Sequence, residues 1–122
     1  MSKNILIIED SSTMRSMIAA IIEEMGDLVI TEAASGFEAL KALPTRNFDL
    51  IITDINMPDI NGLEIVNFVK NHPNYKNIPL IIVTTERSEE DRKKGLALGA
   101  ADYVTKPFKP EDLQKVVRRI IG

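Results

Sequence analysis

The sequence has no cysteine among its 122 residues, which excludes a disulfide framework, a thiolate metal site and a cysteine nucleophile. It also has no long hydrophobic run. The first apolar stretch, Ile5 to Ile8, is followed at once by Glu9 and Asp10. Such a stretch is too short and too soon charged to be a signal peptide or a membrane span. We therefore expect a cytoplasmic protein that does not contact a membrane.

The sequence lacks a concentrated basic region as well. Residues 1–61 carry 4 basic and 10 acidic side chains, and residues 62–122 carry 11 basic and 8 acidic ones. Domains that bind nucleic acid usually have a strong basic patch, so we expect no direct contact with nucleic acid. The basic excess of the second half fits two interpretations, a solvated surface or a surface that meets an acidic partner. Its main contributors are Lys93, Lys94, Lys109, Lys115, Arg118 and Arg119.

Two apolar patterns alternate along a chain whose length suits one domain, residues 1–122. Short runs rich in Ile and Val predict buried strands, at Ile5–Ile8, Leu28–Ile30, Leu50–Ile52, Leu80–Val83 and Tyr103–Val104. Between and after these runs, apolar residues recur at helical spacing, within residues 14–25, 37–43, 63–69 and 113–121. The sequence therefore predicts an α/β fold of the form (βα)5, with a doubly wound parallel sheet.

A further helix is predicted between the fourth and fifth strands, near residues 89–98. This segment is heavily charged, has a thin apolar face and contains Gly95. By intrinsic propensity it is the weakest of the five helices. A solvated surface helix and an element that moves during function both fit this pattern.

Polar residues follow the predicted strands at the edge where such sheets bind ligands. They are Glu9-Asp10, Asp54, Thr84-Thr85 and Thr105-Lys106. Carboxylates that converge on one edge repel each other unless a cation lies among them. Because the ligands on offer are oxygens, Mg²⁺ fits better than zinc or Ca²⁺. A phosphoryl group would be complementary to a metal on one side and to Lys106 and Thr84 on the other.

Each of these residues also has a simpler interpretation. Glu9 and Asp10 lie where they can cap the first helix, Thr84 suits any strand, and Lys106 suits a solvated loop. Asp54 is harder to explain in this way, because a buried carboxylate is costly without partners and the strand before it offers none. The joint placement at strand ends favours a functional site.

The same residues resemble the receiver domain of two-component response regulators over the whole chain. The resemblance rests on the acidic pair after the first strand, Asp54 with Met57-Pro58 and Gly62, Thr84, and Lys106-Pro107-Phe108. It implies a flavodoxin-like sheet with strand order 2-1-3-4-5. The stretch Asp10 to Arg15 is most similar to the chemotaxis regulators of that family.

The resemblance also implies a role for each site residue. Asp54 would be the phosphoacceptor, and Lys106 and Thr84 would bind phosphoryl oxygens. Mg²⁺ would be ligated by Asp10, Asp54 and the backbone carbonyl of Asn56, with Glu9 acting through water. Thr84 and Tyr103 would form the switch, and the Lys106-Pro107 bond would be cis. Such a domain promotes its own phosphorylation and dephosphorylation but is not an enzyme.

Two residues depart from the family pattern. Glu9 stands where many members have aspartate, and Thr85 stands where a smaller residue is common. Our hypothesis is that the bulk of Thr85 slows the entry of water or of small phosphodonors. Asn56 and Glu86, each two residues beyond a site residue, are expected to tune the loss of the phosphoryl group.

The resulting prediction is a signalling switch that takes a phosphoryl group from a sensor histidine kinase and then binds a target through the surface of the fourth helix, fifth strand and fifth helix. We expect a stand-alone regulator that acts on a flagellar motor switch or in a phosphorelay. One alternative is a receiver cut from a longer regulator. Another is a Mg²⁺-dependent phosphatase with an aspartyl nucleophile, but position 56, where that chemistry needs a second acid, is Asn56.

Overall fold

Strands and helices alternate along the whole chain in the computed structural model, which describes residues 2–86 and 88–122. All five predicted strands and all five predicted helices are confirmed. Their bounds are β1 (Lys3–Ile8), α1 (Ser12–Glu23), β2 (Leu28–Ala33), α2 (Gly36–Ala42), β3 (Leu50–Thr53), α3 (Gly62–Asn71), β4 (Leu80–Thr84), α4 (Glu89–Leu98), β5 (Asp102–Thr105) and α5 (Pro110–Ile121). A short 3-10 helix, Leu43–Thr45, follows α2 directly and contains Pro44. The chain therefore stays helical through the proline, but as a 3-10 helix in place of an α-helix.

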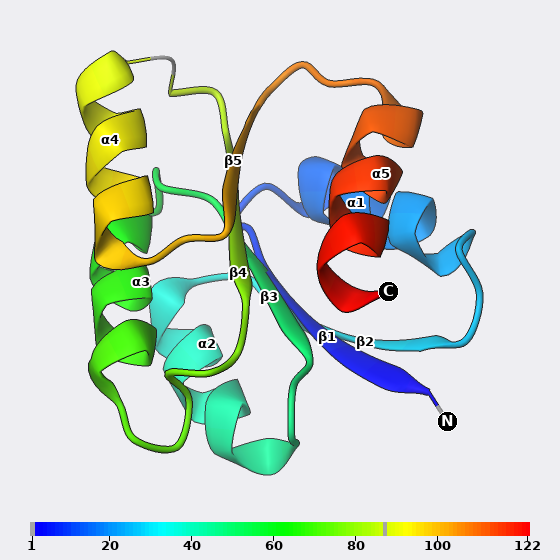
Figure 1. Ribbon diagram of the computed structural model, residues 1–122, viewed down its shortest axis with the longest axis horizontal. Coiled ribbons are helices and arrows are strands. Elements are labelled where there is room, and N and C mark those ends of the chain that lie inside the picture. Colours follow the sequence, from blue (N-terminus) through cyan, green and yellow to red (C-terminus); the bar gives the residue numbers. More distant parts are fainter. Residues whose placement is uncertain (1, 87) are drawn as a thin grey trace.

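The strands form one parallel sheet in the order β2-β1-β3-β4-β5, as the resemblance implied. The helices α1 and α5 cover one face of the sheet, and α2, α3 and α4 cover the other (Figure 1). From β1 the chain passes first to β2 on one side and then to β3 on the other. The crevice at such a reversal is where sheets of this kind bind ligands, so the carboxyl ends of β1 and β3 locate the site.

Two apolar layers hold the helices to the sheet because alternate residues of a strand point to opposite faces. On one face, Ile5 and Ile7 of β1 pack with Ile18, Ile22, Leu113 and Val117 of α1 and α5. On the other, Leu6 and Ile8 pack with residues of α2 to α4 and β5 that include Ala39, Ile65, Val66, Val69, Leu98 and Tyr103. No helix among the described residues has both the length and the apolar character needed to cross a bilayer.

The charged helix α4 is stabilised at both ends, which its composition alone did not indicate. At its start, the side chain of Ser88 accepts a hydrogen bond from the backbone of Asp91, and three acidic residues occupy the first turn. At its end, Gly99 has a φ of 117°, a conformation that favours glycine. Gly95 lets the helix approach β4, because a Cβ at this position would lie 2.6 Å from Cδ1 of Ile82. The glycine that weakens the helix therefore allows close packing.

Candidate functional site

The buried carboxylate of Asp54 has several partners at the end of β3. The residue is 6% exposed, and its backbone N–H donates to the carbonyl of Ile8 at 3.1 Å, extending the pairing with β1. Its Oδ1 accepts hydrogen bonds from the backbone N–H groups of Ile55 at 2.6 Å and Asn56 at 3.2 Å. These bonds offset the cost of burying a carboxylate and hold its second oxygen toward the edge of the sheet.

Lys106 joins two buried carboxylates across this edge. Its Nζ lies 2.9 Å from Oδ2 of Asp54 and 2.5 Å from Oε1 of Glu9. The backbone N–H of Lys106 donates to the carbonyl of Thr84 at 2.7 Å, which ties the loop after β5 to the end of β4. The Lys106-Pro107 bond is cis, as predicted. The residues that directly follow β1, β3 and β5 therefore meet at a single charged cluster.

The electrostatics of the cluster favour the charged forms of Asp54 and Lys106. Burial raises the pKa of Asp54, but hydrogen bonds from Thr84 and Lys106 outweigh it, and the net pKa lies below its usual value. Burial lowers the pKa of Lys106, yet the two carboxylates hold it above its usual value. For Glu9, burial dominates and raises the carboxyl pKa, although bonds from Lys106 and Ser11 act against it. At neutral pH an ionised Asp54 therefore faces a protonated Lys106.

Three carboxylates at this edge lie close enough to share a cation. One oxygen from each of Glu9, Asp10 and Asp54 lies within 4.8 Å of the others. Asp10 is exposed, and within residues 2–86 and 88–122 its carboxylate makes no hydrogen bond or ion pair. Asn56, directly beyond the turn at Asp54, is exposed beside them. A set of oxygen donors that opens to solvent suits a hard cation such as Mg²⁺, which keeps several waters when bound.

A glycine at the start of α3 fits this helix against the phosphoacceptor candidate. A Cβ at Gly62 would lie 1.9 Å from the backbone oxygen of Asp54 and 2.7 Å from Cα of Ile55. The N–H of Gly62 donates to the carbonyl of Ile55 at 2.8 Å, and Asn61 caps the helix through a bond to Leu63. The family motif that includes Gly62 thus has a steric reason here.

Glu86 links the end of β4 to Tyr103. The fully buried Thr84 accepts a hydrogen bond from the backbone N–H of Glu86 at 3.3 Å. The hydroxyl of Tyr103 donates to the backbone carbonyl of Glu86 at 2.8 Å. The ring of Tyr103 is only 8% exposed, so this residue occupies an inward position, with Thr84 beside Asp54. Thr85, by contrast, is exposed at the rim.

Two supporting residues were not foreseen from the sequence. Arg15 of α1 donates from Nη1 to the backbone carbonyl of Glu9 at 2.8 Å and from Nε to Glu32 at 3.1 Å. It lies in the first turn of α1, six residues after Glu9, which is not one of the helical spacings that would have signalled the contact.

Asp59 is the second unforeseen residue. Its carboxylate accepts hydrogen bonds from the backbone N–H groups of Gly36 at 3.1 Å and Phe37 at 2.8 Å. The contact ties the loop after β3 to the start of α2. No pattern in the sequence pairs these two segments, because the contact depends on the path of both loops.

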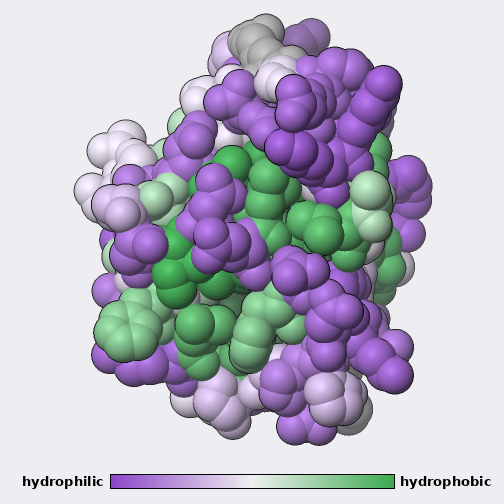
Figure 2. All heavy atoms as spheres, turned by 90° about the vertical axis from the view of Figure 1, so that its left-hand side faces the viewer, coloured by the Kyte–Doolittle hydropathy of each residue, from purple (hydrophilic) through white to green (hydrophobic). Residues whose placement is uncertain are grey.

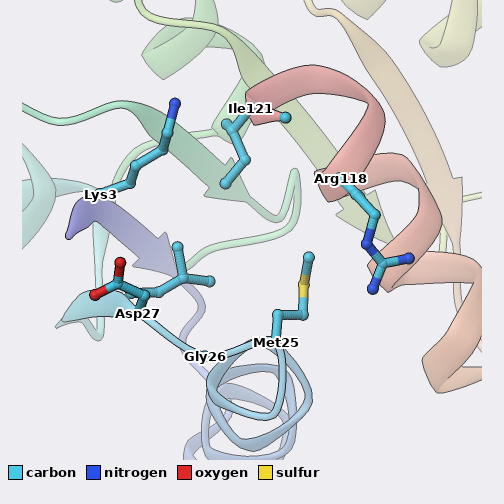
Figure 3. A pocket seen from close by; sticks show the side chains of 8 residues that line it. Lys3, Met25, Gly26, Asp27, Arg118 and Ile121 are labelled. Carbon is cyan, nitrogen blue, oxygen red and sulfur yellow. The ribbon is translucent and has the colours of Figure 1, made fainter. Parts of the chain in front are cut away.

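Other hollows lie away from the acidic cluster. A groove of about 470 Å³ runs between α3 and α4, lined by Leu63, Glu64, Asn67, Lys94, Ala97 and Leu98. Figure 2 shows hydrophobic side chains gathered on this face of α3 and α4, with hydrophilic ones around them. A pocket of about 240 Å³ lies at the opposite edge of the sheet. In Figure 3 its walls are Lys3 and Asp27 on one side and Arg118 on the other, with Met25 and Ile121 between them.

A parallel sheet in this order, with a paired aspartate, lysine and threonine at the carboxyl edge of its strands, defines a phosphoacceptor domain of two-component signalling. Residues 5–118 match the model of the response regulator receiver domain, and the chain belongs to that family. Receiver domains take their phosphoryl group from histidine kinases. As a member of the family, the chain is a phosphoacceptor rather than an enzyme that turns over a substrate.

Among its relatives are regulators of chemotaxis. The chain is 38% identical over 120 residues to a chemotaxis protein CheY homolog of Campylobacter jejuni, covering 97% of this chain and 92% of that protein. The high-resolution structure of the chemotaxis response regulator CheY4 of Vibrio cholerae is similar, with a TM-score of 0.89 at 36% identity, covering 98% of this chain and 99% of that one.

A third similar structure comes from within a kinase. The receiver domain of a sensor histidine kinase from Pseudomonas aeruginosa has a TM-score of 0.89 at 29% identity, covering 100% of this chain and 99% of that one. It holds a magnesium ion in its active-site cleft. The chain is thus CheY-like in sequence and fold, and its acidic cluster is able to hold a metal ion.

Proposed function

We propose that the protein is a phosphorylation-activated switch in which Asp54 accepts a phosphoryl group from a sensor histidine kinase. The observation that carries this proposal is the buried carboxylate of Asp54, paired with Lys106 and facing Asp10 across the open side of the cluster. A carboxylate in this setting is ionised, fixed in direction and reachable from solvent on one side. These are the properties of a nucleophile toward phosphorus.

The transfer requires positioning more than covalent chemistry. An oxygen of Asp54 attacks phosphorus in line while the P–N bond to the partner's histidine breaks, and the electron pair of that bond stays on the imidazole. Lys106 exchanges its bond to Asp54 for one to a phosphoryl oxygen, and the Thr84 hydroxyl donates to another. The product is an acyl phosphate on Asp54, stabilised by groups that are already in place.

The metal site is proposed to consist of Asp10, Asp54 and the backbone carbonyl of Asn56, with Glu9 acting through water. The distances among the three carboxylates and the magnesium ion in the related kinase domain support this assignment. When bound, Mg²⁺ supplies positive charge that reduces the repulsion between Asp54 and the incoming phosphoryl group.

Loss of the phosphoryl group requires a water molecule in line with the new bond. Asn56 and Thr85 are exposed beside the cluster, and Glu86 is half-buried. We assign these three residues to tuning dephosphorylation, by orienting the water or by hindering its entry. Asn56 has an amide and is not a base, so its effect is orientation or steric hindrance.

The output is proposed to pass through Thr84 and Tyr103 to the surface of α4, β5 and α5. Moving a two-state equilibrium from 1:99 to 99:1 takes about 5.5 kcal/mol of differential interaction. Bonds from Lys106 and Thr84 to a phosphoryl group, at roughly 1.5–3 kcal/mol each, are of the right size. On this surface Arg119 pairs with Asp102 and Lys94 pairs with Glu90, so its basic excess is partly offset.

The relatives guide the proposed setting of the switch. The chain spans most of the length of the Campylobacter CheY homolog, which supports a stand-alone, chemotaxis-type regulator of one domain, residues 1–122, in the cytoplasm. Its target would be a protein such as a flagellar motor switch or a phosphorelay component, reached without direct contact with nucleic acid. The related kinase receiver supports the alternative that the chain is one part of a longer protein.

The test is intact mass after incubation with a small phosphodonor and Mg²⁺. One added phosphoryl group is expected on the unaltered protein, and none on Asp54→Asn or in the presence of a chelator. Asp59→Asn, which changes an exposed aspartate nearby, is the matched control and should still be phosphorylated. A phosphoryl group that persists in Asp54→Asn would overturn the assignment of Asp54.

A further inference from the structure

Glu9 is bound through all its polar atoms. Its backbone N–H donates to the carbonyl of Ala33 at 3.0 Å, and its backbone carbonyl accepts from Nη1 of Arg15 at 2.8 Å. Its Oε2 accepts from the backbone N–H of Ser11 at 3.1 Å, and its Oε1 accepts from Nζ of Lys106 at 2.5 Å. The residue is only 2% exposed. The conformation of Glu9 is therefore fixed by contacts with other residues of the protein.

Asp10, the neighbouring acid, has the opposite surroundings. It is exposed, and its carboxylate makes no hydrogen bond or ion pair within the described parts of the chain. Of the two consecutive acids, one has a protein donor on each carboxylate oxygen, and the other has none among the described residues. The two residues therefore have different surroundings, although both belong to the same acidic cluster.

From this contrast we infer that Glu9 is a positioning residue for Lys106 rather than chiefly a residue of the metal site. Lys106 is held between Glu9 and Asp54. When a phosphoryl group arrives on Asp54, Lys106 exchanges only its Asp54 contact, while Glu9 keeps the ammonium group at the site. The inference rests on the proposed role of Lys106 as a ligand of the phosphoryl group.

The length of the glutamate is essential to this role. An aspartate at position 9 would withdraw the carboxylate by one C–C bond, about 1.5 Å. Added to the 2.5 Å contact between Oε1 and Nζ, this exceeds the range of a hydrogen bond, about 3.2 Å. The substitution keeps the negative charge beside the metal site, so Glu9→Asp separates the contact to Lys106 from the charge that attracts Mg²⁺.

The test follows the ammonium resonance of Lys106 in a proton–nitrogen correlation spectrum. In the unaltered protein we expect slow exchange with water both without Mg²⁺ and at saturating Mg²⁺. In Glu9→Asp the exchange rate should rise about tenfold, the factor for one lost charge-assisted hydrogen bond. In Asp10→Asn that rate should stay unchanged, while Mg²⁺ affinity falls about tenfold or more.

Two results would overturn the inference. One is loss of the slow exchange when Mg²⁺ is added to the unaltered protein, because Glu9 would then have left Lys106 for the metal. The other is an unchanged exchange rate in a folded Glu9→Asp. Neither readout requires phosphorylation. A protein that shows the expected exchange but gains no phosphoryl mass would contradict the proposed function and leave the Glu9 contact established.

Discussion

The hydroxyl of Tyr103 and the backbone carbonyl of Glu86 are joined by a hydrogen bond of 2.8 Å. The bond connects β5 to the loop between β4 and α4, the same loop whose Glu86 N–H donates to Thr84. Thr84, which lies beside Asp54, and Tyr103 are therefore both bonded to the backbone of Glu86.

Tyr103→Phe should lower the free energy of unfolding by about 1 kcal/mol, because the ring stays buried while the carbonyl of Glu86 loses its donor. Unfolding in urea measures this cost. Tyr75→Phe is the matched control, since the hydroxyl of Tyr75 makes no hydrogen bond within residues 2–86 and 88–122. Equal losses in the two variants would show that the bond to Glu86 contributes nothing.

Two glycine substitutions should differ sharply in their effect on stability. Gly62→Ala places a Cβ 1.9 Å from the backbone oxygen of Asp54, and backbone cannot move aside cheaply. We expect a loss of about 3 kcal/mol or more. In Gly95→Ala the new Cβ overlaps the end of the Ile82 side chain and makes ordinary contacts with Leu63 and Tyr103. The variant also gains roughly 1 kcal/mol of helix propensity, so its loss should be smaller. Thermal unfolding of the two variants compares them. Similar losses would contradict the steric account of Gly62.

The contact between Asp54 and Lys106 can be predicted from the sequence, because it depends only on the order and direction of the strands. Apolar runs locate the strands, parallel pairing brings their carboxyl ends to one edge, and residues just beyond those ends must converge there. The order of the sheet and the cis bond at Pro107 came from the family resemblance and are confirmed. Neither would follow from periodicity alone.

Contacts that depend on single atoms or on loop paths are beyond such reasoning. The bond from Lys106 to Glu9 depends on the one methylene group by which glutamate is longer than aspartate. The bonds that Asp59 accepts from the start of α2 depend on the conformations of two loops. The packing role of Gly95 was also not predictable from the sequence. Propensity marks it as a weakness of α4, whereas its close approach to Ile82 is a property of the packed pair.

Binding of Mg²⁺ should stabilise the fold. A ligand that binds only the folded state at a hundred times its dissociation constant adds about 2.7 kcal/mol. Thermal unfolding with Mg²⁺ and with a chelator measures this difference. Asp10→Asn should abolish most of the gain, because it removes the carboxylate that faces solvent. If the variant gains as much stability from Mg²⁺ as the unaltered protein, the metal binds elsewhere.

The contact of Asp59 with α2 should depend on pH. The bond from the N–H of Phe37 lowers the pKa of Asp59 below its usual value; burial opposes this effect, and further backbone bonds add to it. Since the folded-state pKa is lowered, the contact is complete above the usual aspartate pKa and is lost as pH falls through the lowered value. The amide resonances of Gly36 and Phe37 should therefore shift together as the pH falls below the usual aspartate pKa. In Asp59→Asn this joint titration should be absent. Its persistence would assign it to another group.

Thr85→Ala tests whether bulk at the rim controls access to the phosphorylated site. The side chain of Thr85 is exposed directly after the buried Thr84, so removing its hydroxyl and methyl groups widens the approach to Asp54 without disturbing the core. Both the hydrolysis of the acyl phosphate and the phosphorylation by small donors should become faster by a few-fold, followed by intact mass over time. Thr45→Ala, at the end of the 3-10 helix near the opposite edge of the sheet, should change neither rate. If both rates in Thr85→Ala equal those of the unaltered protein, access is controlled elsewhere and the remaining candidates are Asn56 and Glu86.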